Sequence, residues 1–194
     1  TNFSFYLGAT NTNLDEIVSV DTKLCCGIKV FMGASTGNLL VDDIKSLEKI
    51  FNEAPILVAT HCEDNKTITQ NFSEAQEHYG KNIPVTEHPV IRSETACYLS
   101  SSFAVNLAKK NNTNLHVLHL TTEKELELFS SGPISSKKIT AEACVHHLWF
   151  SEEDYIDKGS LIKCNPAIKK QTDRQALINA VNTGKIDVIA TDHA

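Results

Sequence analysis

The chain lacks the features that would place it in a membrane, on nucleic acid or around a nucleotide. No apolar run reaches membrane-spanning length, and no charged-then-apolar leader opens the sequence. The 24 acidic and 18 basic residues give a net charge of −6, which argues against a cationic surface for phosphate backbones. Neither G-x-G-x-x-G nor G-K-[ST] follows the first strand-like run, so a nucleotide-binding fold has no support.

C-x-x-C pairs are also missing, which argues against a zinc ribbon and against a thioredoxin-type redox site. Several of the six cysteines interrupt strand-like runs, where cysteine behaves as a small buried hydrophobe. We therefore expect structural thiols in a reducing cytoplasm. The cysteines are Cys25, Cys26, Cys62, Cys97, Cys144 and Cys164.

Six apolar runs of strand length are present, and helical patterns lie between them. The runs fall near residues 3–9, 27–33, 55–61, 114–121, 138–145 and 186–192. Apolar stripes at three- and four-residue steps predict one helix from Ile44, Leu47, Ile50 and Phe51, and another from Ala96, Leu99, Phe103 and Leu107. For the last helix, residues 172–175 read as a capping box and Gly184 as the end.

Strands that alternate with helices predict a parallel sheet covered by helices, either doubly wound or closed into an eight-stranded barrel. A complete barrel takes eight strands and about 250 residues. This chain offers six strands in 194 residues. The expected fold is an α/β partial (β/α)8 TIM-type barrel, from about the third strand to the eighth. Residues 1–194 would form a single barrel domain that is incomplete at both ends.

Three candidate metal ligands end strand-like runs. His61 closes ILVATH, His119 closes LHVLH, and Asp192 follows the final run in ATDHA. In a barrel the carboxyl ends of the strands share one rim, where such folds carry out their chemistry. Imidazole and carboxylate groups converging there could hold a divalent metal ion. A single histidine of this kind would more simply be a hydrogen-bonded core residue, but the repeated position favours ligands.

Lys29 stands inside the apolar run GIKVFMG, where a buried ammonium is costly. A desolvated lysine has a lowered pKa and can react as a free amine. Carboxylation by carbon dioxide would turn it into an anion able to bridge two metal ions. The alternative is a lysine that reaches the rim or pairs with a distant carboxylate.

Other polar residues near the strand ends read mainly as structural. His116 is expected to pack beneath His119, and Glu63 and Asp64 to cap the following helix. Glu142, His146 and His147 could support metal ligands from outside, although a structural role is the simpler interpretation. His193, next to Asp192, points the other way along a strand and is treated as a supporting or packing residue.

The order and spacing of several segments resemble dihydroorotase of the amidohydrolase superfamily, in its barrel type with a carboxylated lysine. The likeness runs over nearly the whole chain from Lys29 onward. The segments are KVFMGAST, THCED, HPVIRSE, LHVLHLTT, TAEACVHHL, KCNPAIK, DRQAL and GKIDVIATDHA.

The resemblance implies a role for particular residues. Lys29 would be the carboxylated ligand bridging two zinc ions, with His61 and His119 on one zinc. Asp192 would bind the other zinc and carry the catalytic proton. Asn165 would hydrogen-bond the pyrimidine ring. Ser35, Thr36 and Gly37 would belong to a mobile loop that closes on substrate, although a plain surface turn explains their composition as well.

The same resemblance implies the reversible hydrolysis of L-dihydroorotate to N-carbamoyl-L-aspartate, a step of pyrimidine biosynthesis. A small-molecule substrate is the expected partner, without nucleic acid or membrane, and a homo-oligomer is left open. Two departures stand out: the H-x-H strand with its arginine, and the Pro-His after ATDHA, are not in the chain. We therefore expect the stretch to be inactive alone. Open alternatives are a hydantoinase or dihydropyrimidinase, an allantoinase, or an inactive relative that serves subunit interaction.

Overall fold

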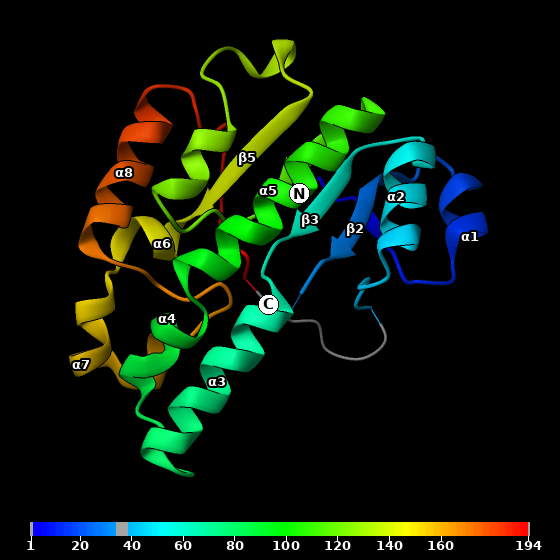
Figure 1. Ribbon diagram of the computed structural model, residues 1–194. Coiled ribbons are helices and arrows are strands. Elements are labelled where there is room, and N and C mark those ends of the chain that lie inside the picture. Colours follow the sequence, from blue (N-terminus) through cyan, green and yellow to red (C-terminus); the bar gives the residue numbers. More distant parts are fainter. Residues whose placement is uncertain (1, 34–38, 194) are drawn as a thin grey trace.

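A computed structural model describes residues 2–33 and 39–193 and arranges six strands in one parallel sheet within this part of the chain (Figure 1). Neighbouring strands along the sequence are neighbours in the sheet, in the order β1-β2-β3-β4-β5-β6. The strands are β1 Phe5–Gly8, β2 Cys25–Phe31, β3 Val58–His61, β4 Leu115–Val117, β5 Ile139–Cys144 and β6 Val188–Ala190. All six predicted runs overlap a strand, β2 beginning two residues before its run, and the partial TIM-type barrel is confirmed.

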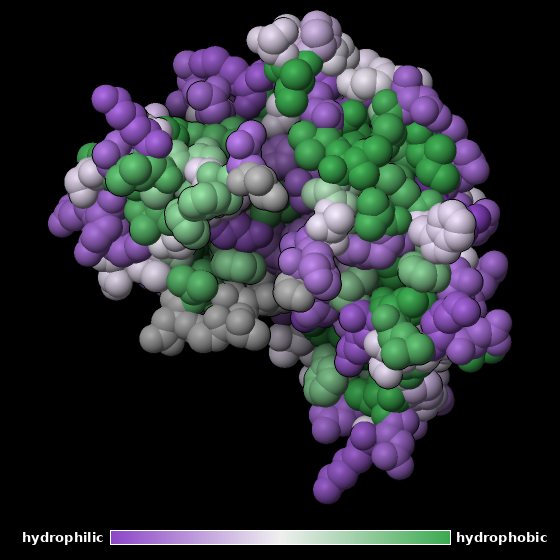
Figure 2. Space-filling model, turned by 180° about the vertical axis from the view of Figure 1, so that it is seen from behind, coloured by the Kyte–Doolittle hydropathy of each residue, from purple (hydrophilic) through white to green (hydrophobic). Residues whose placement is uncertain are grey.

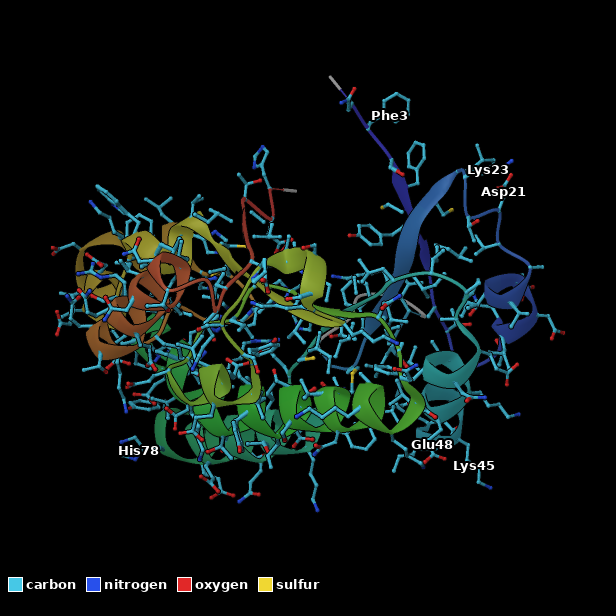
Figure 3. All side chains as sticks on the ribbon, turned by 90° about the horizontal axis from the view of Figure 1, so that it is seen from above. Phe3, Asp21, Lys23, Lys45, Glu48 and His78 are labelled. Atoms are coloured by element: carbon cyan, nitrogen blue, oxygen red, sulfur yellow. The ribbon has the colours of Figure 1, made fainter. Side chains whose placement is uncertain are left out.

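Helices connect the strands and cover the outer side of the curved sheet (Figures 1 and 3). The α-helices are α1 Leu14–Val18, α2 Ile44–Glu53, α3 Asn65–Tyr79, α4 His88–Ile91, α5 Glu94–Asn111, α6 Val145–Trp149, α7 Tyr155–Lys158 and α8 Gln171–Asn182. Short 3-10 helices are η1 Val85–Glu87, η2 Lys124–Leu128, η3 Ile134–Ser136, η4 Glu152–Asp154 and η5 Gly159–Ile162. Each crossover returns the chain to the same end of the next parallel strand.

Apolar residues of β2, β3 and β4 form the centre of the core. Ile28, Val30, Val58, Leu115 and Val117 are fully buried, and residues of α2 and α5 pack against them. Strands buried on both faces need continuous apolar runs, which is the pattern that made them visible in the sequence. No described helix combines the length and the apolar character required to cross a membrane.

The predicted apolar stripes were partly wrong. In α2, Leu47, Ile50 and Phe51 are buried as expected, but Ile44 in the first turn is exposed. In α5, Leu99 and Phe103 are exposed. The buried face of α5 instead consists mainly of small residues, namely Ala96, Cys97, Ser100, Ser101, Ala104, Val105 and Ala108. Leu107 is the one large apolar residue on this buried face.

The last helix begins two residues earlier than a cap at Thr172 would require. Lys170 is the N-cap residue of α8, and the Asp173 carboxylate accepts a hydrogen bond from the Lys170 backbone N–H at 3.2 Å. The other oxygen of Asp173 accepts from the Glu123 N–H at 2.8 Å, a contact from a distant segment that fixes the cap. Gly184, with φ of 65°, follows the helix end as predicted.

The carboxyl ends of β2 and β3 meet closely, at a position where only glycine fits. A Cβ atom on Gly33 would lie 1.8 Å from the Glu63 carbonyl oxygen. The Met32 N–H donates to the His61 carbonyl at 3.0 Å. These contacts align the segment after Lys29 with the segment after His61, and so bring two candidate site residues to the same rim.

Candidate active site

The candidate site lies where β2, β3 and β4 end. Lys29 pairs in register with Ala59 of β3, and His61 is the last residue of β3, opposite Phe31. His119 follows β4 by two residues, and the Leu118 N–H donates to the Thr60 carbonyl. The face opposite to that of Figure 1 is hollowed in its middle, with hydrophilic residues in its depth (Figure 2).

His61 and His119 face each other across this rim. His61 Nδ1 lies 3.1 Å from His119 Nε2, and the two rings meet edge to face with centroids 4.7 Å apart. Both side chains are buried. The structure therefore brings together the two imidazoles that the strand ends predicted to converge.

His119 is held in an unusual state for a histidine. Its φ of 40° lies in the left-handed region, which is uncommon for a residue with a Cβ and is often found at functional sites. Burial, followed by the charges of His61 and Lys29, holds the pKa of His119 well below its usual range. Its Nδ1 is buried without a hydrogen-bond partner among the described residues. A neutral imidazole is a suitable metal ligand.

Glu63 supports His61 rather than capping a helix, which corrects the interpretation from sequence. Glu63 is fully buried, and its Oε2 lies 2.9 Å from His61 Nε2 and also contacts Arg92 Nη1. Burial alone would raise the pKa of Glu63, but the His61 hydrogen bond and the Arg92 charge outweigh it and lower the pKa. Asp64 alone caps α3, accepting from the Thr67 N–H at 2.8 Å.

Because the Glu63 carboxylate accepts a hydrogen bond from His61 Nε2, the lone pair of His61 is left on Nδ1, the atom that faces His119. Carboxylates commonly orient metal-binding histidines in this way. Nothing in THCED distinguishes this glutamate from the capping aspartate beside it. Its contacts with His61 and with Arg92, 29 residues further along the chain, reveal its role.

We expect Glu63→Gln to weaken metal affinity by about 10–100-fold, because the amide cannot fix the His61 tautomer as a carboxylate does. The change also leaves Arg92 without its anionic partner. Metal affinity is measured by competition with a chromophoric chelator. Asp64→Asn is the matched control, since asparagine also caps helices. Equal affinity in both variants would contradict the positioning role of Glu63.

Lys29 is largely buried near this pair, and burial lowers the pKa of its ammonium group although the charges of Asp192 and Glu142 oppose the shift. Its Nζ lies 4.7 Å from the centre of the Phe31 ring. Among the described residues no carboxylate comes within ion-pair distance of it. Lys29 is thus partly buried, and the described part of the chain shows no carboxylate paired with it. The other form of the alternative, a lysine that reaches the rim, stays open.

His116 and Glu142 form a supporting layer below His119. His116 Nε2 lies 3.1 Å from Glu142 Oε2, and its Nδ1 lies 2.9 Å from Thr140 Oγ1. The His119 N–H donates to Glu142 Oε1 at 3.3 Å. His116 is thus saturated by hydrogen bonds in the way expected for a structural residue.

The remaining candidates lie further from the histidine pair. Asp192 is exposed, two residues beyond β6, with φ of 45°, and it is close enough to act on Lys29 and His146 electrostatically. Asn165 precedes a cis peptide bond and lines a cavity together with Arg92. Ser35, Thr36 and Gly37 lie outside the described residues. The full ligand set around Lys29 and Asp192 stays a prediction.

The histidine pair fits one metal ion. His61 Nδ1 and His119 Nε2 are 3.1 Å apart, which is less than the combined length of two zinc–nitrogen bonds of about 2.0–2.1 Å each. One ion placed between the two atoms can therefore bind both. Glu63 presets the ligating nitrogen of His61, and His119 is neutral. Such a donor set is typical of zinc.

Sequence comparison finds relatives among enzymes that open cyclic amides. The chain is 31% identical over 183 residues to a dihydroorotase of Staphylococcus epidermidis, covering 92% of this chain and 41% of that protein. It is 28% identical over 172 residues to an allantoinase of Bacillus velezensis, covering 87% of this chain and 37% of that protein. The chain thus spans about two fifths or less of the length of these curated relatives. No family model matches it.

Solved structures of a hydantoinase and of a dihydroorotase share the fold. An L-hydantoinase (dihydropyrimidinase) from Arthrobacter aurescens superposes with a TM-score of 0.90 at 21% identity, over 100% of this chain and 43% of that one. A dihydroorotase from Saccharomyces cerevisiae gives 0.68 at 20% identity, over 98% and 52%. The chain is therefore similar in sequence to dihydroorotases and to an allantoinase, which are cyclic amide hydrolases, and it shares the fold of the hydantoinase. Within that group its resemblance to dihydroorotase is confirmed by several relatives near 30% identity.

Proposed function

We propose that the protein containing this chain is a zinc-dependent dihydroorotase, which hydrolyses L-dihydroorotate reversibly to N-carbamoyl-L-aspartate in pyrimidine biosynthesis. The observation that carries the proposal is the buried His61–His119 pair, oriented by Glu63, at the rim of a barrel whose sequence relatives include dihydroorotases. The six cysteines are all free, which supports the proposed reducing cytoplasm.

In this proposal His61 and His119 hold one zinc ion, and Lys29 and Asp192 complete a two-zinc site. Carboxylation of Lys29 would join Nζ to the carbon of carbon dioxide and release one Nζ proton. Bound zinc would supply Lewis acidity, which lowers the pKa of a bound water and polarises the ring carbonyl. Burial prepares Lys29 for this reaction because it favours the uncharged amine.

The residues of the chain would then handle the proton and the ring. An Asp192 carboxylate oxygen would accept a proton from the attacking water and return it to the ring nitrogen that leaves. Asn165, at the edge of the cavity beside Arg92, would hydrogen-bond the pyrimidine ring. The proposed partner is therefore a small, anionic cyclic amide.

A substrate comparison with the full-length protein tests the proposal. Dihydroorotate, dihydrouracil, hydantoin and allantoin are offered in parallel, and ring opening is followed by ultraviolet absorbance or product analysis. We expect hydrolysis of dihydroorotate at the highest kcat/KM. Preference for allantoin would favour the second candidate, to which the Bacillus velezensis relative points. A metal-loaded protein inactive on all four would favour the inactive relative.

We expect Lys29→Ala to lower metal content and activity, and small carboxylic acids such as acetate to restore part of both. The acid can occupy the bridging position that the carboxylated side chain would fill. Zinc content and turnover are measured with increasing acid concentration. The His61→Ala variant serves as control, because an added carboxylate does not replace an imidazole. Full metal content and activity in Lys29→Ala without added acid would contradict the bridging role.

A further inference from the structure

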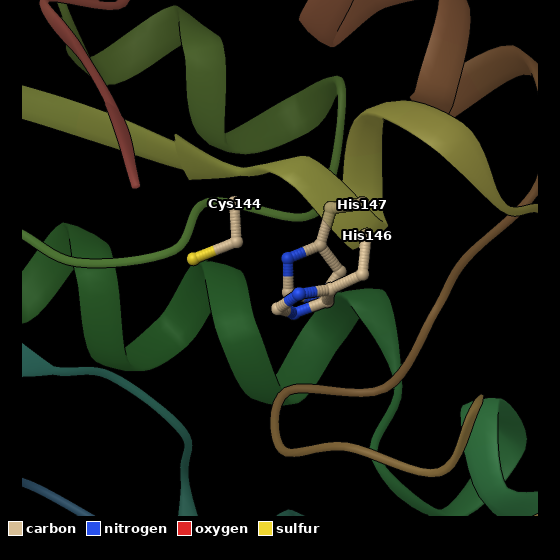
Figure 4. Close-up of side chains that lie close together, drawn as sticks. All are labelled: Cys144, His146 and His147. Carbon is tan, nitrogen blue, oxygen red and sulfur yellow. The ribbon is translucent and has the colours of Figure 1, made fainter. Parts of the chain in front are cut away.

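A second group of metal-ligating side chains lies at the end of β5 and in the first turn of α6. Cys144, His146 and His147 each contribute one ligand atom, and these atoms all lie within 4.8 Å of one another. Figure 4 shows the two imidazole rings beside each other, with the Cys144 side chain to one side of them. The ring centroids of His146 and His147 are 4.2 Å apart. This group shares no residue with the His61–His119 pair.

One ring nitrogen of His147 is free to bind a cation. Its Nε2 lies 3.0 Å from the Pro166 carbonyl oxygen, which only accepts hydrogen bonds, so Nε2 carries the proton. The lone pair is then on Nδ1, which is buried and has no hydrogen-bond partner in the described part of the chain. Burial and the neighbouring His146 lower the pKa of His147 to about 3, so the ring is neutral at physiological pH. A buried acceptor without a partner calls for an explanation, and a cation supplies one.

Cys144 supplies the sulfur ligand of the group, and His146 is its partly exposed member, through which a cation can enter from solvent. The thiol is fully buried, and burial raises its pKa to about 12, so the free group is an uncharged thiol. His146 is only half-buried. Its pKa is lowered by burial, against the opposing charge of Asp192, so this ring too is available as a neutral donor. One sulfur and two imidazole nitrogens suit zinc and softer cations, whereas calcium and magnesium prefer oxygen.

We propose that Cys144, His146 and His147 bind one thiophilic divalent cation such as Zn²⁺, at a site separate from the His61–His119 pair. On binding, the Cys144 S–H bond breaks, its proton passes to solvent, and a metal–sulfur bond forms. Binding therefore tightens as pH rises. The cation would also hold the ring whose other nitrogen bonds to the Pro166 carbonyl, next to Asn165.

Cadmium is the probe that distinguishes this site from the histidine pair. Cd²⁺ bound to a thiolate produces an ultraviolet charge-transfer band, whereas Cd²⁺ on His61 and His119 has no sulfur ligand and produces none. We expect the metal-free full-length protein to develop the band with one Cd²⁺ per chain. Cys144→Ser should abolish the band. His147→Gln should weaken the Cd²⁺ affinity, measured from the growth of the band with Cd²⁺ concentration, by about tenfold or more.

Two matched cysteine variants make the test specific. Cys164 is also close to His147, with Sγ 3.7 Å from Nε2, but it is outside the group. Cys26 is exposed and follows Cys25, so it could take up cadmium by itself. Cys164→Ser and Cys26→Ser should keep the band. A band that survives Cys144→Ser, or disappears in either control, overturns the assignment.

A measurement on the parent protein guards against variants that fail to fold. Cadmium NMR of the Cd²⁺-loaded protein should show a resonance in the range of mixed sulfur and nitrogen ligands. Resonances only in the nitrogen and oxygen range would overturn the proposal. Neither measurement involves turnover, so a failed substrate assay leaves the result of this test unaffected.

Discussion

Asp192→Asn in the full-length protein is expected to lower turnover by about 10²–10⁴-fold while the fold and at least one metal ion are retained. An amide can neither accept the proton of the attacking water nor return it to the leaving nitrogen. Asp192 is exposed just beyond β6, so the substitution disturbs no core contact. Asp157→Asn, at an exposed position in α7, is the control for loss of one negative charge.

The two directions of the reaction should respond oppositely to pH. Ring opening requires the Asp192 carboxylate as a base, so its rate should fall when the group is protonated at low pH. Ring closure requires the protonated form and should fall at high pH. Both profiles are measured for the parent and the variant. Parallel profiles in the two directions, or a variant within about tenfold of the parent, would remove Asp192 from the proton-transfer role.

Loss of either histidine of the pair is the second large effect that we expect. His61→Ala and His119→Ala should each reduce zinc content and abolish nearly all activity. The two ring nitrogens, 3.1 Å apart, would bind the same ion, so either substitution removes one of its two imidazole ligands. Zinc is measured by elemental analysis of the purified full-length protein. His78→Ala, on the exposed side of α3, should change neither quantity (Figure 3).

Folding controls are needed because both histidines are buried. Thermal unfolding of each variant is compared with that of His119→Gln, which preserves much of the side-chain volume. A variant that folds and keeps full zinc occupancy would show that its histidine is not a ligand. Loss of zinc in His119→Gln at unchanged thermal stability would attribute the effect to ligation rather than to packing.

Secondary structure and strand order could be predicted because the central strands β3 and β4 are buried on both faces. Such strands need unbroken apolar runs, so ILVATH and LHVLH marked both the strands and the side chains at their ends. Parallel strands joined by helices all end at one rim, which placed His61 and His119 together before any distance was known. The burial of Lys29 could be predicted for the same reason.

The packing of α5 could not be predicted from hydrophobicity. Leu99 and Phe103 are exposed, whereas Ala96 and Leu107 of the same expected stripe are buried. The helix instead buries Ser101, whose hydroxyl donates to the buried Glu125 carboxylate at 2.6 Å. A polar residue becomes buried here because its partner comes from a distant segment, and that partner is invisible in a local pattern.

By itself, the sequence determined the fold class, the two facing histidines and the buried lysine, because these follow from apolar periodicity and the geometry of parallel strands. Only the tertiary structure decided that Glu63 orients His61, that Arg92 holds Glu63, and that His147 keeps an unpartnered nitrogen beside Cys144. Hydrogen-bond partners and tautomers depend on segments far apart in the chain. Their roles are therefore defined by distance in space, which residue spacing does not encode.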